Sequence, residues 1–262
     1  MSRKKSQLIE SNDMWRWCVL LGAGLLHSVA ALAADDFPER VLFVGNSYFY
    51  YNNSLHNHLK GFVQAGSRGK EHKLDYKSAT ISGADLDDHP IEWLTEPGRI
   101  GVKVPFELVV LAGHSADALS ERSRQRFAET VQRFDRVIRA RGGRTVLYMT
   151  HAYVSPHRQA ASGNMQKIAS MFSDVARQTG ATVIPVGLAF EESYKRRPDV
   201  RLHDEHDGSH PSVAGTYLAA AVAYKALYGL DPVGNAYNYH GKVAPDLALH
   251  LQKVARDVMV GP

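Results

Sequence analysis

Short apolar runs alternate with stretches of helical periodicity along most of this 262-residue chain. The clearest run is Glu-Leu-Val-Val-Leu-Ala at residues 107–112, and strong helical periodicity follows it over residues 120–140. Apolar runs this short fit strands that are buried on both faces, and parallel strands need a crossover between them. We therefore predict one α/β domain built on a parallel sheet with helices on both faces. The predicted strands are residues 41–44, 74–80, 107–112, 146–150 and 182–186, and the predicted helices between them are residues 54–65, 86–94, 120–140 and 166–179.

Two more helices are predicted near the C-terminus. Pro211 opens an apolar stretch that runs to Tyr228, and Gly229 follows it. Proline is favoured in the first turn of a helix and glycine just beyond the last, so we predict a core helix from Pro211 to Tyr228. Residues 244–258 have the periodicity of an amphipathic helix.

The first 33 residues differ from the rest of the chain. Arg3, Lys4, Lys5 and Arg16 precede an apolar stretch that ends in Ala31-Leu32-Ala33. This pattern is typical of a secretory signal peptide, so we predict a signal peptide at residues 1–33, a mature domain at residues 34–262 and a periplasmic or secreted location. An uncleaved N-terminal anchor is the alternative. The only cysteine, Cys18, lies in this segment, which leaves the mature protein no thiol for catalysis.

The charge balance argues against several classes of partner. Removal of residues 1–33 takes away four of the 31 basic and two of the 27 acidic residues, which leaves 27 against 25. A net charge this close to zero gives no electrostatic basis for binding nucleic acid or an anionic membrane surface. We therefore expect no nucleic-acid partner and no stable membrane insertion after cleavage of the signal peptide.

Polar residues follow the ends of two predicted strands. Gly45-Asn46-Ser47 comes directly after the first strand, and Gly113-His114-Ser115 follows the strand at 107–112. Ligands of parallel sheets bind beyond the carboxyl ends of the strands, which is where these segments lie. Asp207 and His210 belong to a later loop that can reach the same edge, so a hydroxyl, an imidazole and a carboxylate are available for nucleophilic catalysis. A helix N-cap is the alternative role for Ser47.

These segments resemble the SGNH (GDSL-type) hydrolase superfamily, in particular the branch with Gly-Asn-Ser in its first block. The resemblance extends over the mature chain and includes Asp207-Gly208-Ser209-His210-Pro211. It implies a three-layer α/β/α sandwich with a flavodoxin-like, five-stranded parallel sheet, and ester hydrolysis through an acyl-enzyme without a metal or organic cofactor. It also implies that Ser47 is the nucleophile, His210 the base and Asp207 the carboxylate that orients the base. Gly83 matches the glycine whose N–H joins that of Ser47 in the oxyanion hole.

The third block departs from the pattern of this family. The family usually has Gly-x-Asn, whose Asn donates to the oxyanion, whereas this chain has Gly113-His114-Ser115. Loss of one oxyanion donor lowers the rate by about 10²–10³-fold, so Ser115 is the candidate replacement, with a helix cap as its alternative role. Leu-Ala-Gly-His-Ser also resembles the nucleophile elbow of α/β-hydrolases, with Ser115 as nucleophile, but that turn needs a small residue where Asp117 stands.

Tyr48, His114 and His151 are candidates for substrate binding, because they follow the ends of predicted strands. The aromatic run Tyr48-Phe49-Tyr50-Tyr51 directly follows Ser47 and is a candidate sugar-stacking or acyl-binding wall, with burial in the core as the alternative for some of its rings. A surface loop position is the alternative for His151. His and acidic residues crowd residues 203–210, but Gly208 and Pro211 interrupt any regular set of ligands. We therefore predict no metal site there and expect residues 203–206 to be solvated.

The sequence thus predicts an exported serine ester hydrolase that acts on a small-molecule or carbohydrate ester, with carbohydrate deacetylation among its candidate activities. A noncatalytic carbohydrate-binding protein of this fold is one alternative, and an enzyme that transfers acyl groups between sugars is the other. Acetylated polysaccharide, lipid ester and peptidoglycan are all compatible with export, and fold analogy does not choose among them. The sequence also leaves the oligomeric state open.

Overall fold

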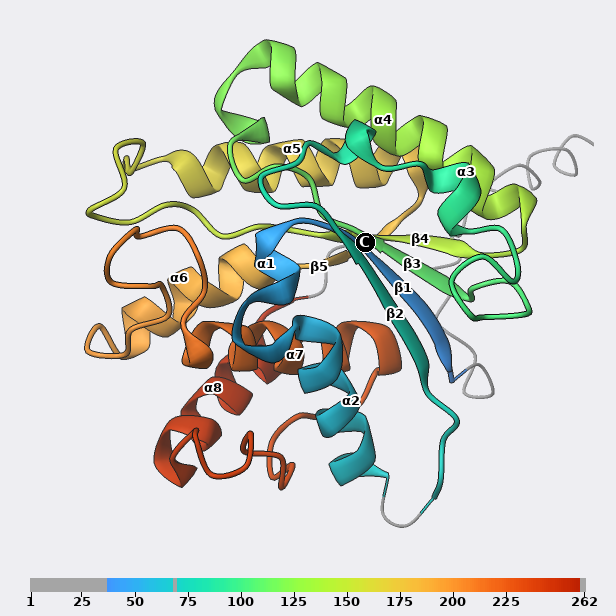
Figure 1. The fold of residues 1–262 in the computed structure, drawn as a ribbon. Helices are drawn as coiled ribbons and strands as arrows, with labels where there is room; N and C mark the ends of the chain where they lie inside the picture. Colours follow the sequence, from blue (N-terminus) through green and yellow to red (C-terminus); the bar gives the residue numbers. More distant parts are fainter. Residues whose placement is uncertain (1–36, 68–69, 260–262) are drawn as a thin grey trace, which may run out of the picture. The chain divides into compact units, whose positions relative to one another are not determined.

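A parallel sheet forms the centre of the computed structural model, which describes residues 37–67 and 70–259. Its strands are β1 (Arg40–Gly45), β2 (Asp75–Thr80), β3 (Leu108–Leu111), β4 (Arg144–Tyr148) and β5 (Thr182–Ile184). They lie in the order β2-β1-β3-β4-β5, and every neighbouring pair is parallel (Figure 1). The chain moves from β1 to one edge for β2 and then returns past β1 to β3. This reversal between β1 and β3 marks the place where such sheets bind ligands.

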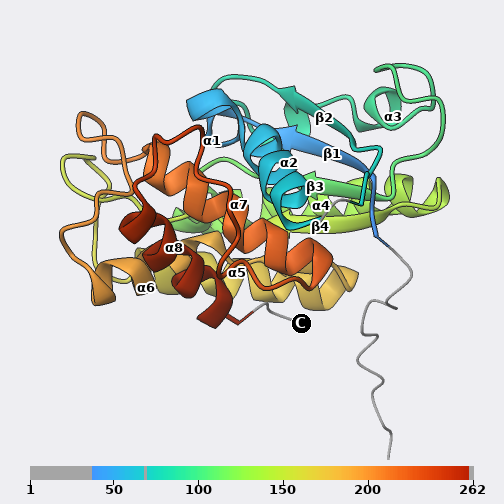
Figure 2. The same cartoon turned by 90° about the horizontal axis from the view of Figure 1, so that it is seen from below.

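Helices cover both faces of the sheet (Figure 1 and Figure 2). One face carries α2 (Leu55–Gly66), α6 (Val186–Arg196), α7 (Val213–Tyr228) and α8 (Pro245–Asp257), and the other carries α3 (Ile91–Leu94), α4 (Glu121–Ala140) and α5 (Asn164–Thr179). Successive strand residues face opposite layers, so Phe43 and Val110 pack in the first core while Val44 and Leu111 pack in the second. The architecture is the predicted three-layer α/β/α sandwich.

A proline shortens one predicted element and divides another. The strand predicted at residues 182–186 ends at Ile184, since Pro185 has no N–H for the next hydrogen bond, and the unexpected helix α6 begins at Val186. The helix predicted at residues 86–94 is instead a 3₁₀ turn, Leu86–Asp88, followed by the short α3 after Pro90.

The predicted core helix begins two residues later than expected. The side chain of Ser212 accepts the N–H of Gly215, which makes Ser212 the N-cap of α7 and leaves Pro211 outside the helix. α7 packs against α2, α6 and α8, so it is buried on nearly every side. In the described ranges, no helix is long and apolar enough to cross a membrane. The predicted signal peptide at residues 1–33 lies outside these ranges.

Candidate active site

Ser47 begins a short helix, α1 (Ser47–Tyr50), directly after β1. The residue that caps α1 is Asn46, whose side-chain oxygen accepts the N–H of Tyr48 at 3.2 Å. The alternative role of Ser47 as the N-cap is therefore wrong. Asn46 Nδ2 donates to the carbonyl of Gly113 at 3.0 Å, so this buried amide connects the turn at Ser47 to the loop that begins with Gly113. The N–H of Ser47 lies in the first turn of α1 and has no acceptor within the helix.

The structure brings the side chains of Ser47, His210 and Asp207 together. His210 Nε2 lies 2.8 Å from Ser47 Oγ, and His210 Nδ1 lies 2.5 Å from Asp207 Oδ2. An ionised carboxylate only accepts hydrogen bonds, so Nδ1 carries the ring proton and Nε2 presents a lone pair to the serine hydroxyl. The hydroxyl of Ser47 thus donates to His210, which is the arrangement in which an imidazole can take the proton of a serine.

Hydrogen bonds within its own turn keep Asp207 ionised. Asp207 Oδ1 accepts the backbone N–H groups of Ser209 at 2.7 Å and of His210 at 2.9 Å. Burial by itself raises the pKa of Asp207, but the hydrogen bonds from the His210 ring and these two N–H groups outweigh it, and the pKa lies below its usual value. Gly208 makes the turn possible, because at its φ of +63° an added Cβ would lie 2.1 Å from the carbonyl oxygen of Val154.

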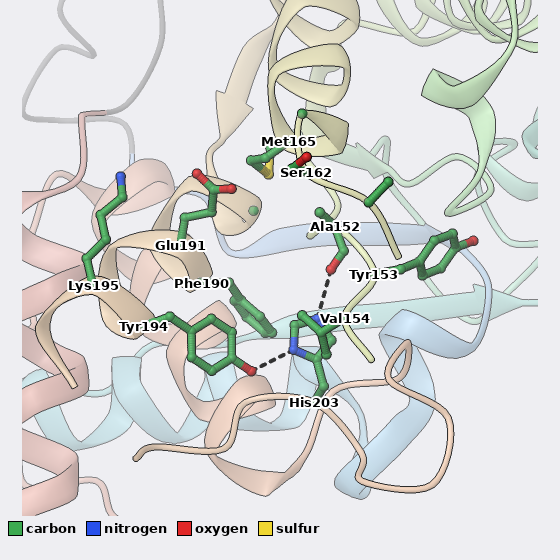
Figure 3. A pocket seen from close by; sticks show the side chains of 13 residues that line it. Ala152, Tyr153, Val154, Ser162, Met165, Phe190, Glu191, Tyr194, Lys195 and His203 are labelled. Carbon is green, nitrogen blue, oxygen red and sulfur yellow. Dashed lines mark hydrogen bonds between the residues drawn. The ribbon is translucent and has the colours of Figure 1, made fainter. Parts of the chain in front are cut away.

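The loop of residues 204–210 follows a buried histidine. His203 is 2% exposed. Its Nδ1 accepts from the hydroxyl of Tyr194 at 2.7 Å, and its Nε2 donates to the carbonyl of Ala152 at 3.0 Å (Figure 3). Burial lowers the pKa of His203 to about 4, so the ring is neutral and fixed in one tautomer. The expectation that His203 is solvated is therefore wrong. Within residues 37–67 and 70–259, no three His, Cys, Asp or Glu side chains are grouped as metal ligands.

A cavity of about 290 Å³ opens beside His203, between α6 and the start of α5 (Figure 3). Phe190 and Tyr194 line it together with the segment from Ala152 to Val154. The three residues of the Ser47 cluster do not line this cavity. The side chains of His210 and Asp207 are instead 25% and 38% exposed, so the cluster meets solvent outside this cavity.

Tyr48 and His151 form a buried stack beside His210. The ring of His151 lies 4.6 Å from that of Tyr48 and 4.2 Å from that of Phe190, nearly parallel to both. His151 Nε2 donates to the carbonyl of Ser209 at 2.7 Å, and the hydroxyl of Tyr48 lies 3.0 Å from Ser209 Oγ. Burial holds the pKa of His151 well below its usual value, so the ring is neutral. The surface-loop alternative for His151 is wrong, and both side chains support the residue that precedes His210.

The candidate oxyanion donors lie in the loops after β1, β2 and β3. Gly83 is exposed and has a φ of +66°, in a turn where Ala84 N–H donates to the carbonyl of Ile81 at 3.3 Å. Ser115 Oγ lies 2.5 Å from the hydroxyl of Tyr153. Ser115 does not cap the 3₁₀ turn Asp117–Leu119, whose N-cap is Ala116. The partner of its hydroxyl is a phenol rather than an imidazole, which argues against Ser115 as the nucleophile of an α/β-hydrolase elbow.

Asp117 organises the third block. Its Oδ2 accepts the N–H of His114 at 2.8 Å, and Gly113 leaves room for it, since a Cβ there would lie 2.4 Å from the same oxygen. The ring of His114 turns back on its own loop, where Nδ1 accepts the N–H of Ala116 at 3.1 Å. Burial and the neighbouring Asp85 carboxylate raise the pKa of Asp117 to about 7. A substrate-binding role for His114 stays a prediction.

Tyr51 belongs to the aromatic run that directly follows Ser47. Its ring stacks on that of His210, with the centroids 4.1 Å apart and the planes 8° from parallel. The ring of Tyr50 continues the stack at 5.6 Å and is 37% exposed. The run Tyr48-Phe49-Tyr50-Tyr51 is the signal in the sequence, but it does not say which of its rings stacks on His210.

Solved structures share this arrangement of elements. A DUF4886 family protein from Bacteroides uniformis has a TM-score of 0.62 and 17% identity, over 82% of this chain and 92% of its own. A protein from Slackia heliotrinireducens, proposed to be an SGNH hydrolase, has a TM-score of 0.56 and 21% identity, over 72% and 99%. The acetyl xylan esterase AlAXEase has a TM-score of 0.54 and 16% identity, over 71% and 98%. No protein-family model and no curated protein matches the sequence.

At these identities the likeness concerns the path of the chain. The similarity covers 92%, 99% and 98% of the lengths of these three solved structures. The chain therefore has the fold of the SGNH (GDSL-type) hydrolases.

Proposed function

We propose that this protein is a serine ester hydrolase with Ser47 as its nucleophile. The observation that carries the proposal is the 2.8 Å contact between Ser47 Oγ and His210 Nε2, with Asp207 2.5 Å from the other ring nitrogen. A serine hydroxyl becomes nucleophilic when a base takes its proton, and the base works best when a third group orients it. The similar fold of an acetyl xylan esterase supports the same class of reaction.

In the proposed mechanism, Ser47 Oγ attacks the ester carbonyl while His210 Nε2 takes its proton. Asp207 stays ionised and stabilises the imidazolium. The N–H groups of Ser47 and Gly83, together with Ser115, stabilise the negative charge on the carbonyl oxygen. His210 then gives the proton to the leaving alcohol, and the acyl group stays on Ser47. Water, activated by His210 in the same way, releases the acid and restores Ser47.

We also propose that the leaving alcohol belongs to a carbohydrate. Tyr50 and Tyr51 stack beside His210, and the hydroxyl of Tyr50 donates to Ser82 Oγ at 3.0 Å, which holds an aromatic surface next to the nucleophile. Aromatic rings with one polar end suit the mixed apolar and hydroxylated faces of a sugar. Sugar esters are therefore the favoured substrates, and the similar fold of an acetyl xylan esterase favours acetates among them. We further propose that a signal peptide at residues 1–33 exports the enzyme and so gives it access to acetylated polysaccharide.

Hydrolysis of a short-chain aryl ester by Ser47→Ala tests the proposed nucleophile. We expect this substitution to lower kcat by about 10⁴-fold or more, because the covalent route is lost. Ser170→Ala is the matched control, since Ser170 is an exposed serine on α5, and it keeps the wild-type rate. Hydrolysis by Ser47→Ala at the wild-type rate would refute the assignment.

The alternative functions give different outcomes with the wild-type protein. A noncatalytic binding protein hydrolyses neither acetylated sugars nor acyl esters of graded length. An acyltransferase forms a new ester when an alcohol acceptor is added, whereas the proposed hydrolase releases only free acid.

A further inference from the structure

The third oxyanion donor is built differently from the other two. Ser47 and Gly83 offer backbone N–H groups, whose directions the chain fixes, whereas Ser115 offers a hydroxyl whose proton can rotate. The phenol of Tyr153 is bound to this hydroxyl, with the oxygens 2.5 Å apart. Burial raises the pKa of Tyr48, and Ser115 lies close enough to lower it in part. Ser115 is therefore beside the residue that follows the nucleophile.

Other donors near Ser115 are already engaged in internal hydrogen bonds. The N–H of His114 donates to Asp117 Oδ2 at 2.8 Å, and the N–H of Ala116 donates to His114 Nδ1 at 3.1 Å. The side-chain amide of Asn46 donates to the carbonyl of Gly113. A substrate that recruited any of these groups would break a bond that shapes the loop. The hydroxyl of Ser115 and the Nε2–H of the His114 ring are the side-chain donors of this block that lie outside these bonds, and Ser115 stands where the resemblance places the Asn donor.

Either hydroxyl of the Ser115–Tyr153 pair can donate the hydrogen bond between them, so the direction of that bond matters. If Ser115 donated to Tyr153, its proton would be lost to the oxyanion. A phenol is the stronger donor of the two and an aliphatic hydroxyl is the better acceptor, which favours donation from Tyr153. Tyr153 keeps its proton because burial raises its pKa. Its ring is 7% exposed and stacks on His157 at 3.7 Å, so the phenol is held in place.

We propose that Tyr153 is a positioning residue of the oxyanion hole, whose hydroxyl donates to Ser115 Oγ and leaves the Ser115 proton for the oxyanion. This inference rests on the proposed function of Ser47. A hydroxyl that accepts a hydrogen bond is also a better donor, because the two bonds polarise each other. One buried phenol thus gives a rotating hydroxyl both a direction and a greater donor strength.

A double-mutant cycle on aryl ester hydrolysis tests the role of Tyr153. Tyr153→Phe removes the hydroxyl and keeps the ring stacked on His157. We expect Ser115→Ala to lower kcat by about 10²-fold and Tyr153→Phe to lower it on the order of 10-fold, with KM little changed, because the donor acts in the transition state. In the Ser115→Ala background, Tyr153→Phe has no further effect. Tyr228→Phe is the control, since that phenol contacts Tyr76 and the carbonyl of Pro38 instead.

Ser115→Asn gives a second test that does not depend on the stability of Tyr153→Phe. An amide N–H₂ has no rotating proton, so we expect Ser115→Asn to exceed Ser115→Ala in kcat and to be insensitive to Tyr153→Phe. Equal kcat values for Ser115→Asn and Ser115→Ala would overturn the inference.

The cycle has two further outcomes that would overturn it. One is an unchanged kcat in Tyr153→Phe, and the other is a loss in Tyr153→Phe that persists in Ser115→Ala, as a merely structural role would produce. Failure of the proposed function is distinct, because it shows as wild-type activity in Ser47→Ala measured alongside.

Discussion

Two carboxylates in the loops beyond the sheet, Asp207 and Asp117, accept backbone N–H groups in short turns but differ in their ionisation. Asp207 accepts two such groups and the ring of His210, and its side chain is 38% exposed. Asp117 accepts one, from His114, and its side chain is 5% exposed. The pKa of Asp207 lies below its usual value, whereas burial and Asp85 raise that of Asp117 to about 7.

The difference between the two pKa values shows how the surroundings of each carboxylate decide whether it is charged near neutral pH. Asp207 stays charged through mildly acidic pH and so can stabilise an imidazolium, while Asp117 shapes a loop whether or not it is charged. Their effects on stability have opposite signs. The lowered pKa of Asp207 adds stability above about pH 4 that is lost in acid. The raised pKa of Asp117 costs stability as the pH rises from about 4 to about 7, and the cost is constant above that.

Replacement of the charged carboxylate gives the largest expected effect. In Asp207→Asn, the amide oxygen still accepts the N–H groups of Ser209 and His210, but the amide N–H₂ donates to His210 Nδ1 and places the ring proton on Nε2. We expect kcat to fall by about 10⁴-fold with the fold intact. Asp204→Asn is the matched control in the same loop, where Asp204 Oδ1 accepts the N–H of His206. A kcat of Asp207→Asn within ten-fold of that of the control, which is a difference of about 1.4 kcal/mol in activation free energy, would contradict this prediction.

Asp117→Asn changes stability rather than activity. The folded protein binds a proton at Asp117 between about pH 4 and 7, which the unfolded chain does not, so wild-type stability falls over this range by up to about 4 kcal/mol. The stability of Asp117→Asn does not fall in this way, because an amide does not ionise. Urea unfolding at pH 5 and pH 8 measures the free energy of unfolding of both proteins. We expect the variant to become more stable relative to the wild type as the pH rises. A difference between the two proteins that does not change with pH would contradict the raised pKa.

Asp85→Asn gives the smallest expected effect and tests whether the Asp85 charge raises the pKa of Asp117. Arg126 lies 2.7 Å from Asp85 Oδ2 and 3.9 Å from Asp117 Oδ1. Loss of the Asp85 charge leaves Arg126 to act on Asp117 alone, so we expect the pKa of Asp117 to fall by less than about one unit, or about 1.4 kcal/mol. The ¹³C shift of the Asp117 carboxyl during an NMR titration reports this pKa, with Asp117→Asn to assign the signal. A pKa that rises or stays constant would exclude Asp85 as a cause.

The sequence predicts most of the fold because β1, β3, β4 and β5 each contain a short apolar run, whereas the edge strand β2 is largely polar. β3 shows this most clearly, since its four residues are all buried. α6 escapes prediction because the apolar run of β5 continues through Pro185 into the helix, so hydropathy does not mark where the strand ends. The split of residues 86–94 likewise depends on Pro90 more than on periodicity.

The site divides in the same way into local and distant features. Ser47 can be named from the sequence because it follows the first apolar strand, and Asp207 and His210 can be named because they share one short motif before α7. Tyr51 can be named only as one ring of the aromatic run after Ser47, and Tyr153 cannot be named at all, because their contacts join loops that are far apart in the chain. The buried state of His203 and His151 also depends on helix α6, which supplies Phe190 and Tyr194 as their neighbours.

Labelling with a fluorophosphonate, followed by peptide mass mapping, tests the central claim that Ser47 is an activated nucleophile. We predict one adduct, on Ser47, that forms in the wild type, is absent from Ser47→Ala and forms slowly in Asp207→Asn. An adduct on Ser115, or no adduct on a folded wild-type protein, would contradict the account.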